Sequence, residues 1–139
     1  MRDAGSATLN WKEKAGQYTI VLFGPMNAYQ LVLRGNKKEV KLRINNNQEI
    51  KADSAEALAL QTLGYPLPIS HLRYWIRALP VPGTPASYHF TQNQELNELE
   101  QDGWKILYLE YMNKDGYNLP RKIRLEKEGL SLKIFIDHW

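Results

Sequence analysis

Hydrophobic residues recur at every second position along most of this 139-residue chain. The segment EVKLRI at 39–44 shows the pattern clearly, because Val40, Leu42 and Ile44 alternate with Lys41 and Arg43. A period of two places one set of side chains on one face of a β-strand and the other set on the opposite face. The chain is therefore predicted to fold mainly as antiparallel β-sheet, with one face buried.

The same alternation predicts further strands between turn signals. They fall at 17–23, 29–34, 48–52, 88–92, 95–100, 104–111, 122–127 and 130–137. The strand QYTIVLF at 17–23 is apolar on both faces, so we expect it to be covered on both sides. The triple asparagine at 45–47 and the pair Asp102-Gly103 predict tight turns. A longer loop is predicted at 113–120, and a final hairpin is predicted around Gly129.

Two helices are predicted in the middle of the chain. The first follows a capping box, with Asp53 as N-cap and Glu56 three residues on, and it ends at Gly64. Ser70 is predicted to cap the second helix. Its apolar side chains follow i, i+3, i+4, i+7 spacing and are Leu72, Trp75, Ile76 and Leu79. The proline-rich segment at 80–85 is then predicted to be a loop.

These elements are predicted to form a single domain over residues 1–139. An antiparallel sheet of this length closes on itself, packs against itself or wraps around helices. A curved sheet whose open side is covered by the two helices accounts for both the two-sided apolar strand and the apolar helix face. The apolar aromatic residues then either fill a core or line a cavity.

Residues that carry catalysis are not arranged in any recognisable pattern. The absence of cysteine excludes disulfides and thiol catalysis, and His71, His89 and His138 are too far apart in sequence to predict a metal site. The net charge of +3 comes from Lys and Arg that alternate with Glu, which is typical of a solvated sheet face and not of a nucleic-acid site. We therefore predict no enzyme activity, no metal, no cofactor and no nucleic-acid partner.

The turn GPMN at 24–27 is unusual because its tip carries an apolar side chain, Met26. Turns usually face water and carry polar residues. Met26 either projects toward an apolar partner or folds back onto the core. The neighbouring Gly24 and Pro25 stiffen a turn and do not bury it, which favours projection.

Two long segments resemble the LolB family of outer-membrane lipoprotein receptors. They are LFGPMNAYQLVL at 22–33 and ALALQTLGYPLPISHLRYWIRALPVPG at 57–83. The first carries the family's turn after a strand, and the second carries its Pro-x-Pro, its Leu-Arg-x-Trp-Ile helix and its Leu-Pro exit. The segments GWKILYLEY, LPRKIRLE and LKIFIDHW are similar to the family's closing strands, so the resemblance spans nearly the whole chain.

The resemblance implies an incomplete antiparallel β-barrel, with helices covering the open side of an apolar cavity. It implies a monomer that accepts acylated lipoproteins from the periplasmic carrier LolA and inserts them into the inner leaflet of the outer membrane. The candidate residues for the acyl cavity are Leu72, Trp75, Ile76, Trp104 and Tyr108. The alternative is a soluble periplasmic carrier of lipid or of another apolar ligand, with no transfer role.

The resemblance also assigns a role to the turn, because the family's protruding loop places an apolar residue in the membrane. Here that loop is Gly24, Pro25, Met26 and Asn27, with methionine where the family usually has leucine. The two side chains are similar in volume and apolarity, so we expect the role to survive. The resemblance begins at the family's second strand, and we expect its signal, its acylated cysteine anchor, its first helix and its first strand to be missing from this chain.

Overall fold

The fold comes from a computed structural model that describes residues 2–24, 30–36, 38–45, 48–51, 57 and 68–138. The chain divides into two compact units. The N-terminal unit comprises Ala7–Ser70 with Asp137–Trp139, and the C-terminal unit comprises Met1–Ser6 with His71–Ile136. Each unit contains antiparallel strands, so the predicted mainly β fold class is confirmed.

The N-terminal unit is a sheet in which the strands are hydrogen-bonded in the order β5-β4-β3-β2-β1. The strands are β1 (Arg2–Lys14), β2 (Gln17–Phe23), β3 (Gln30–Gly35), β4 (Val40–Ile44) and β5 (Ile50–Lys51). The first five residues of β1 belong to the C-terminal unit. No strand was predicted at 2–14, because the small and polar residues of its first half lack the apolar alternation.

One face of this unit is buried, as the alternation predicts. Ile20 pairs with Leu33 and Leu33 with Leu42, and all three side chains are buried. The rings of Trp11 and Tyr18 stack beside them, with their centroids 5.4 Å apart. The opposite face of β2 carries side chains that are only half-buried. The strand is therefore covered completely on one side and in part on the other.

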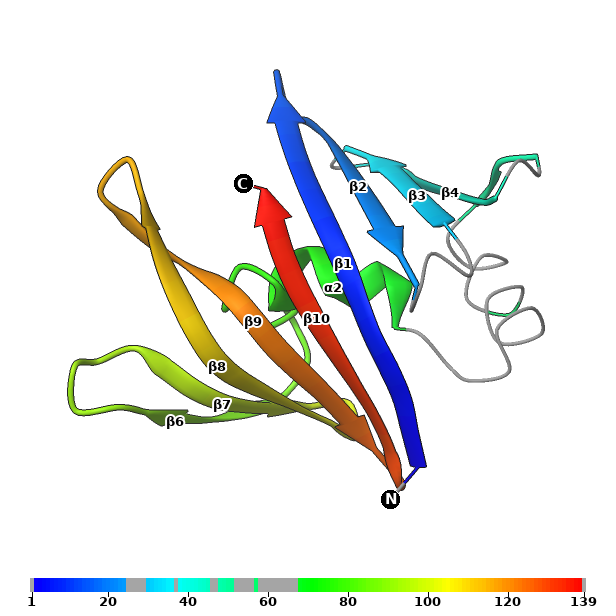
Figure 1. The fold of residues 1–139 in the computed structure, drawn as a ribbon. Helices are drawn as coiled ribbons and strands as arrows, with labels where there is room; N and C mark the ends of the chain where they lie inside the picture. The colour runs from blue at the N-terminus through cyan, green and yellow to red at the C-terminus, as the bar shows by residue number, and fades with distance from the viewer. Residues whose placement is uncertain are drawn as a thin grey trace. The chain divides into compact units, whose positions relative to one another are not determined.

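The C-terminal unit contains a second set of antiparallel strands, in the order β10-β9-β8-β7-β6 (Figure 1). The elements are α2 (Ile69–Trp75), β6 (Ala86–Phe90), β7 (Leu96–Gln101), β8 (Trp104–Lys114), β9 (Tyr117–Lys127) and β10 (Leu130–His138). The first two residues of α2 and the last two of β10 belong to the N-terminal unit. The two end strands of this order, β10 and β6, are not hydrogen-bonded to each other, so the described strands of this unit form an open sheet.

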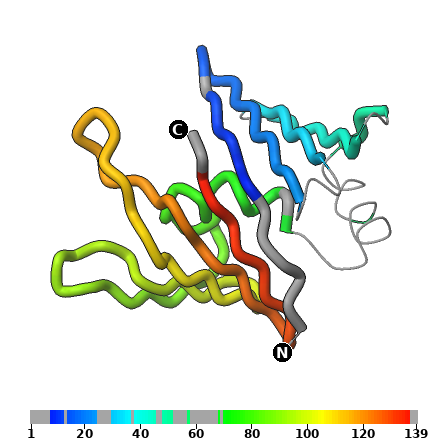
Figure 2. Tube along the Cα trace, viewed as in Figure 1, coloured from blue at the N-terminus to red at the C-terminus, as the bar shows by residue number. Residues whose placement is uncertain are grey.

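Tight turns connect the long strands of the C-terminal unit. Asp102 and Gly103 both have positive φ, 54° and 78°, as a two-residue hairpin turn of type I′ requires, and the predicted turn is confirmed. Asp115 and Gly116 repeat this geometry with φ of 53° and 86°. The predicted loop at 113–120 is therefore wrong, because β8 continues to Lys114 and β9 begins at Tyr117. Figure 2 follows the path of the chain through this hairpin.

Helix α2 is shorter than its apolar spacing predicts. It begins at Ile69, so Ser70 lies inside the first turn, and it ends at Trp75. Ala78 adopts a left-handed φ of 60°, which stops the helical path. Leu79 is consequently 43% exposed and does not share the buried face expected for it. The other predicted helix, at 53–64, lies outside the described residues except for Ala57.

Candidate functional site

A continuous apolar face runs across the strands of the C-terminal unit. The cross-strand pairs join Leu132 to Leu125, Leu125 to Ile106, and Ile106 to Leu99. Directly paired residues lie on the same face of a sheet, and each of these four side chains is at most 2% exposed. We call this side of the C-terminal unit the inner face. It is the face that the alternation of β7 to β10 predicts.

Helix α2 packs on the inner face through its tryptophan. The ring centroid of Trp75 lies 6.4 Å from that of Trp104, and the Tyr108 hydroxyl donates a hydrogen bond of 2.6 Å to the Trp75 carbonyl. Leu72 and Ile76 lie three residues before and one residue after Trp75, and both are buried. The structure therefore brings the helix, Trp104 and Tyr108 together as predicted. Whether they line a cavity for an acyl chain stays a prediction.

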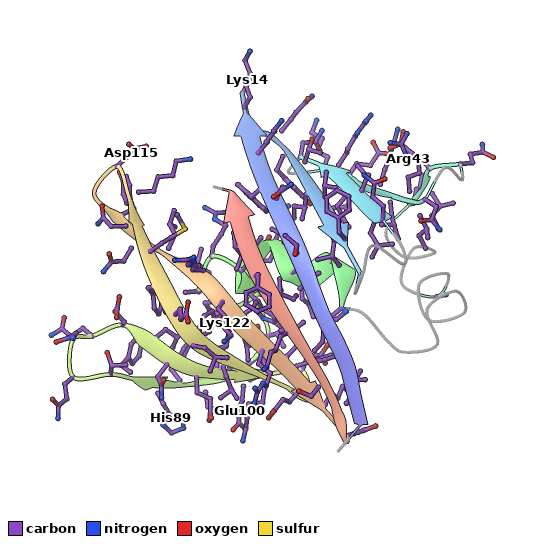
Figure 3. The ribbon with its side chains drawn as sticks, viewed as in Figure 1. Lys14, Arg43, His89, Glu100, Asp115 and Lys122 are labelled. Atoms are coloured by element: carbon purple, nitrogen blue, oxygen red, sulfur yellow. The ribbon has the colours of Figure 1, made fainter. Side chains whose placement is uncertain are left out.

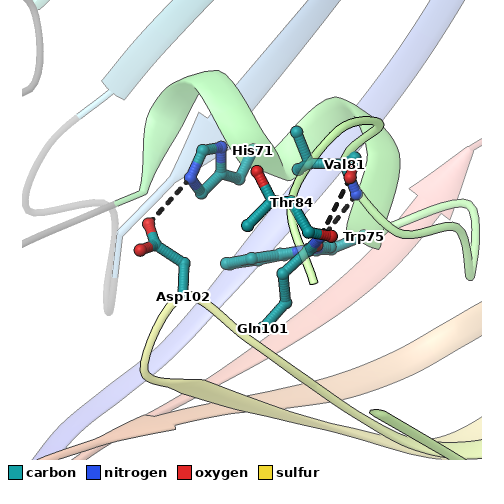
Figure 4. Close-up of polar contacts among 6 residues, drawn as sticks. All are labelled: His71, Trp75, Val81, Thr84, Gln101 and Asp102. Carbon is teal, nitrogen blue, oxygen red and sulfur yellow. Dashed lines mark hydrogen bonds and ion pairs between the residues drawn. The ribbon is translucent and has the colours of Figure 1, made fainter. Parts of the chain in front are cut away.

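Gln101 joins α2, the following loop and β7, as the close-up shows (Figure 4). Its side-chain oxygen accepts hydrogen bonds from Trp75 Nε1 at 2.9 Å and from the Val81 amide at 2.8 Å. Its side-chain nitrogen donates to the carbonyls of Val81 and Thr84 at 2.9 and 3.0 Å. Sequence reasoning missed this buried residue. The available signal was a polar side chain at an inward position of β7, two residues after the buried Leu99.

His71 makes a second contact between α2 and the turn after β7. Its Nε2 lies 3.1 Å from a carboxylate oxygen of Asp102, and its ring meets that of Trp75 edge-on at 5.1 Å (Figure 4). The Asp102 side chain is 59% exposed, so the pair is screened by water. Such surface pairs contribute about 0–1 kcal/mol. The buried hydrogen bond between Trp75 Nε1 and Gln101 is therefore expected to contribute more to the attachment of α2 than this exposed pair does.

Two tyrosines of β8 are held in their neutral form. Burial, followed by the effect of Tyr111, raises the pKa of Tyr108 well above its usual value. Burial, followed by the nearby carboxylate of Glu95, raises the pKa of Tyr111 to about 12. Both hydroxyls therefore remain donors at neutral pH, and that of Tyr111 donates to the Leu96 carbonyl at 2.6 Å. They hold backbone in place and offer no base for catalysis.

An open groove of about 670 Å³ lies at the end of the C-terminal unit where the β7–β8 and β9–β10 turns meet. Of the five predicted acyl-cavity residues, only Trp104 lines it. The remaining lining includes four carboxylates and two lysines: Glu100, Asp102, Glu126, Glu128, Lys105 and Lys127. Such a polar surface does not suit an acyl chain, so the groove is not the predicted cavity.

The predicted membrane loop is described only at its first residue. Gly24 follows β2 and is buried. Pro25, Met26 and Asn27 lie outside the described residues, so the role of this loop stays a prediction. Within the described part of the chain, no helix is long and apolar enough to cross a membrane. In the same residues, no group of three or more His, Asp or Glu side chains is placed to hold a metal ion.

The C-terminal unit thus combines an open antiparallel sheet, an apolar inner face and a helix packed on that face. The family model for "Outer membrane lipoprotein LolB" matches residues 1–139. The outer-membrane lipoprotein LolB of Pseudomonas paraeruginosa is 38% identical over 99% of this chain and 67% of its own length. Those of Pseudomonas aeruginosa and Pseudomonas fluorescens are 38% and 37% identical over the same shares.

The chain therefore belongs to the LolB family. It is a receptor of the outer membrane that acts in lipoprotein localisation. The resemblance stated from the turn and helix motifs is confirmed over the whole chain.

Proposed function

We propose that this receptor accepts acylated lipoproteins from a LolA-like periplasmic carrier and inserts them into the inner leaflet of the outer membrane. The observation that carries this mechanism is the continuous apolar inner face of the C-terminal unit. Moving an acyl chain between two proteins and a bilayer makes and breaks no covalent bond. The receptor then works as a monomeric, single domain over residues 1–139, without enzyme activity and without a cofactor or metal.

The acyl chain is held by α2 and the inner face, in a half-barrel whose helices cover an apolar cavity. Leu72, Trp75 and Ile76 contribute the helix side, and Trp104 and Tyr108 contribute the sheet side. The buried aromatic contact between Trp75 and Trp104 supports this placement, since both sides of the contact are apolar. Each methylene removed from water contributes about 0.8 kcal/mol, so a few more buried carbons than in the carrier set the direction of transfer.

The loop of Gly24, Pro25, Met26 and Asn27 is the part that touches the bilayer. Burying one methionine side chain contributes about 1.5–3 kcal/mol, which is a weak and reversible contact. A receptor that delivers its cargo and then returns for more needs such a contact. The alternative, a soluble periplasmic carrier without a transfer role, lacks a use for this loop and is not favoured by the family.

A fluorescent fatty acid tests the acyl site directly. We expect the folded protein to bind the probe, and we expect Ile76→Gln to weaken binding about tenfold, because a polar side chain is placed among buried apolar groups. Leu79→Gln is the matched control, since Leu79 is three residues away but exposed. Circular dichroism verifies that each variant is folded. A folded parent protein that binds no probe would contradict the acyl site.

The handover from the carrier is tested by its dependence on salt. The net charge of +3 favours docking to an acidic carrier surface. We expect the association rate with a LolA-like carrier to fall about threefold when the salt concentration rises from 50 to 500 mM. Stopped-flow fluorescence measures this rate. A rate that does not change with salt would leave only shape and apolar contact to guide docking.

A further inference from the structure

The inner face continues beyond its buried part to an exposed pair of aromatic rings. Leu99 pairs with Tyr88 of β6, and Leu96 pairs with Phe90, so both rings lie on the inner face. Tyr88 is 44% exposed and Phe90 is 63% exposed. Their rings stack with centroids 6.2 Å apart and planes 22° from parallel. Two stacked, solvent-exposed aromatic rings at the edge of a buried apolar face form a surface that a partner can contact, which we call the platform.

Strand β6 is also the last strand in the hydrogen-bonded order of the sheet (Figure 1). One side of its backbone is therefore not paired with any described strand. Lys, Pro or a bulge usually prevents an edge strand from pairing with another chain. The sequence ASYHF of β6 contains no charged residue and no proline, and its one register shift falls between His89 and Phe90. The ladder of Ala86–His89 before that shift is regular and can accept another strand.

We propose that β6 binds the polypeptide segment next to the acyl anchor of a lipoprotein, as an added β-strand. This inference rests on the proposed function, because it places the protein part of the same cargo. Acyl chains and polypeptide start from one residue of the cargo, so an acyl chain on the inner face brings the following residues to its rim. Tyr88 and Phe90 stand at that rim and give the segment an apolar surface on one side.

Main-chain pairing suits a receptor of lipoproteins that differ in sequence. Hydrogen bonds to a strand edge are made by backbone groups, so they do not depend on the side chains of the cargo. The outward face of β6 adds little selectivity for the sequence of the cargo. Its His89 side chain is 66% exposed, and His89 Nε2 lies 3.8 Å from a carboxylate oxygen of Glu98. Figure 3 shows His89 and Glu100 extending away from these strands. Specificity then comes from the acyl anchor, and the added strand contributes affinity.

The test compares three probes for the same protein. They are a fluorescent fatty acid, a synthetic acylated peptide, and acylated peptides with N-methyl groups on alternate amides. An added strand directs only every second amide to β6. We expect one N-methylation pattern to weaken binding about tenfold and the alternate pattern to leave it within twofold. Hydrogen exchange at β6 should slow with the acylated peptide and stay unchanged with the fatty acid.

Matched variants locate the effect on the protein. Phe90→Lys should weaken the acylated peptide about tenfold without changing fatty-acid binding, because it removes a ring of the platform and charges the edge. Tyr117→Lys is the control, since Tyr117 is 71% exposed on another hairpin and its loss should change neither affinity. Both sites are exposed, so both variants should remain folded.

Three results would overturn the inference. Equal binding of both N-methylated peptides excludes strand addition. Unchanged peptide affinity in Phe90→Lys, together with unchanged hydrogen exchange at β6 when the peptide binds, excludes β6 as the site. A protein that sediments as a dimer, and as a monomer after Phe90→Lys, shows that a second copy of the chain occupies the edge. If the proposed acyl site is wrong, the result differs from these three, because the fatty acid would then bind neither the parent protein nor any variant.

Discussion

Met26→Glu is expected to stop the release of lipoprotein into a bilayer while leaving its acceptance from the carrier intact. A carboxylate at the tip of the loop resists leaving water, so the contact between loop and membrane is lost. The inner face belongs to other elements and is unchanged, so the acyl chain still binds. A transfer assay with a carrier loaded with acylated lipoprotein measures acceptance, and the addition of liposomes measures release. We expect release to fall by at least tenfold.

Met26→Leu is the matched control and should behave as the parent protein, because leucine preserves apolarity and volume. The free energy of unfolding of Met26→Glu should stay within about 0.5 kcal/mol of the parent, as for an exposed site. A loss of several kcal/mol would mean that Met26 is a core residue and that the membrane role is wrong. Normal stability together with normal release would place the membrane contact elsewhere on the molecule.

The period of two predicted most of the sheet because burial of one face constrains every second residue. In β9 and β10 the apolar residues at alternate positions, Ile123, Leu125, Leu132 and Ile134, are all buried. The pair Asp102-Gly103 predicted its hairpin for a local reason, since both residues need positive φ and glycine adopts it without strain. Trp75, Trp104 and Tyr108 were named together from the family resemblance, and the structure brings them into contact.

Other features depend on contacts that the local sequence does not show. The first half of β1 is polar and small, so it is a strand although its own residue pattern does not predict one. The polar segment at 113–120 has the composition of a loop. Its two-residue turn nevertheless keeps β8 and β9 paired up to the end of the hairpin, where Asn113 lies opposite Asn118. The position of Leu79 depends on the left-handed Ala78 before it, which helical spacing does not predict.

Gln101→Leu is expected to lower the free energy of unfolding by about 2–3 kcal/mol, the largest stability effect proposed for this chain. Leucine nearly preserves the volume of glutamine but makes none of its four hydrogen bonds. Trp75 Nε1 is then a buried donor without its acceptor. The Val81 and Thr84 groups lie nearer to water, which can replace part of their lost bonds. Urea unfolding followed by tryptophan fluorescence measures the change.

Glu100→Gln is the matched control, because Glu100 is the exposed neighbour of Gln101 in the same strand and points to the opposite face. Its stability should stay within about 0.5 kcal/mol of the parent protein.

Gln101→Glu distinguishes the contribution of the hydrogen bonds from that of packing. Ionised glutamate still accepts from Trp75 Nε1 and the Val81 amide, but it faces two carbonyls that it cannot satisfy. The Gln101→Glu variant should therefore be less stable than the parent protein at neutral pH. Part of its stability should return in acid, because the protonated carboxyl group can again donate a hydrogen bond. Leucine should show no such recovery, and a leucine variant as stable as the parent would mean that packing alone holds α2 on the sheet.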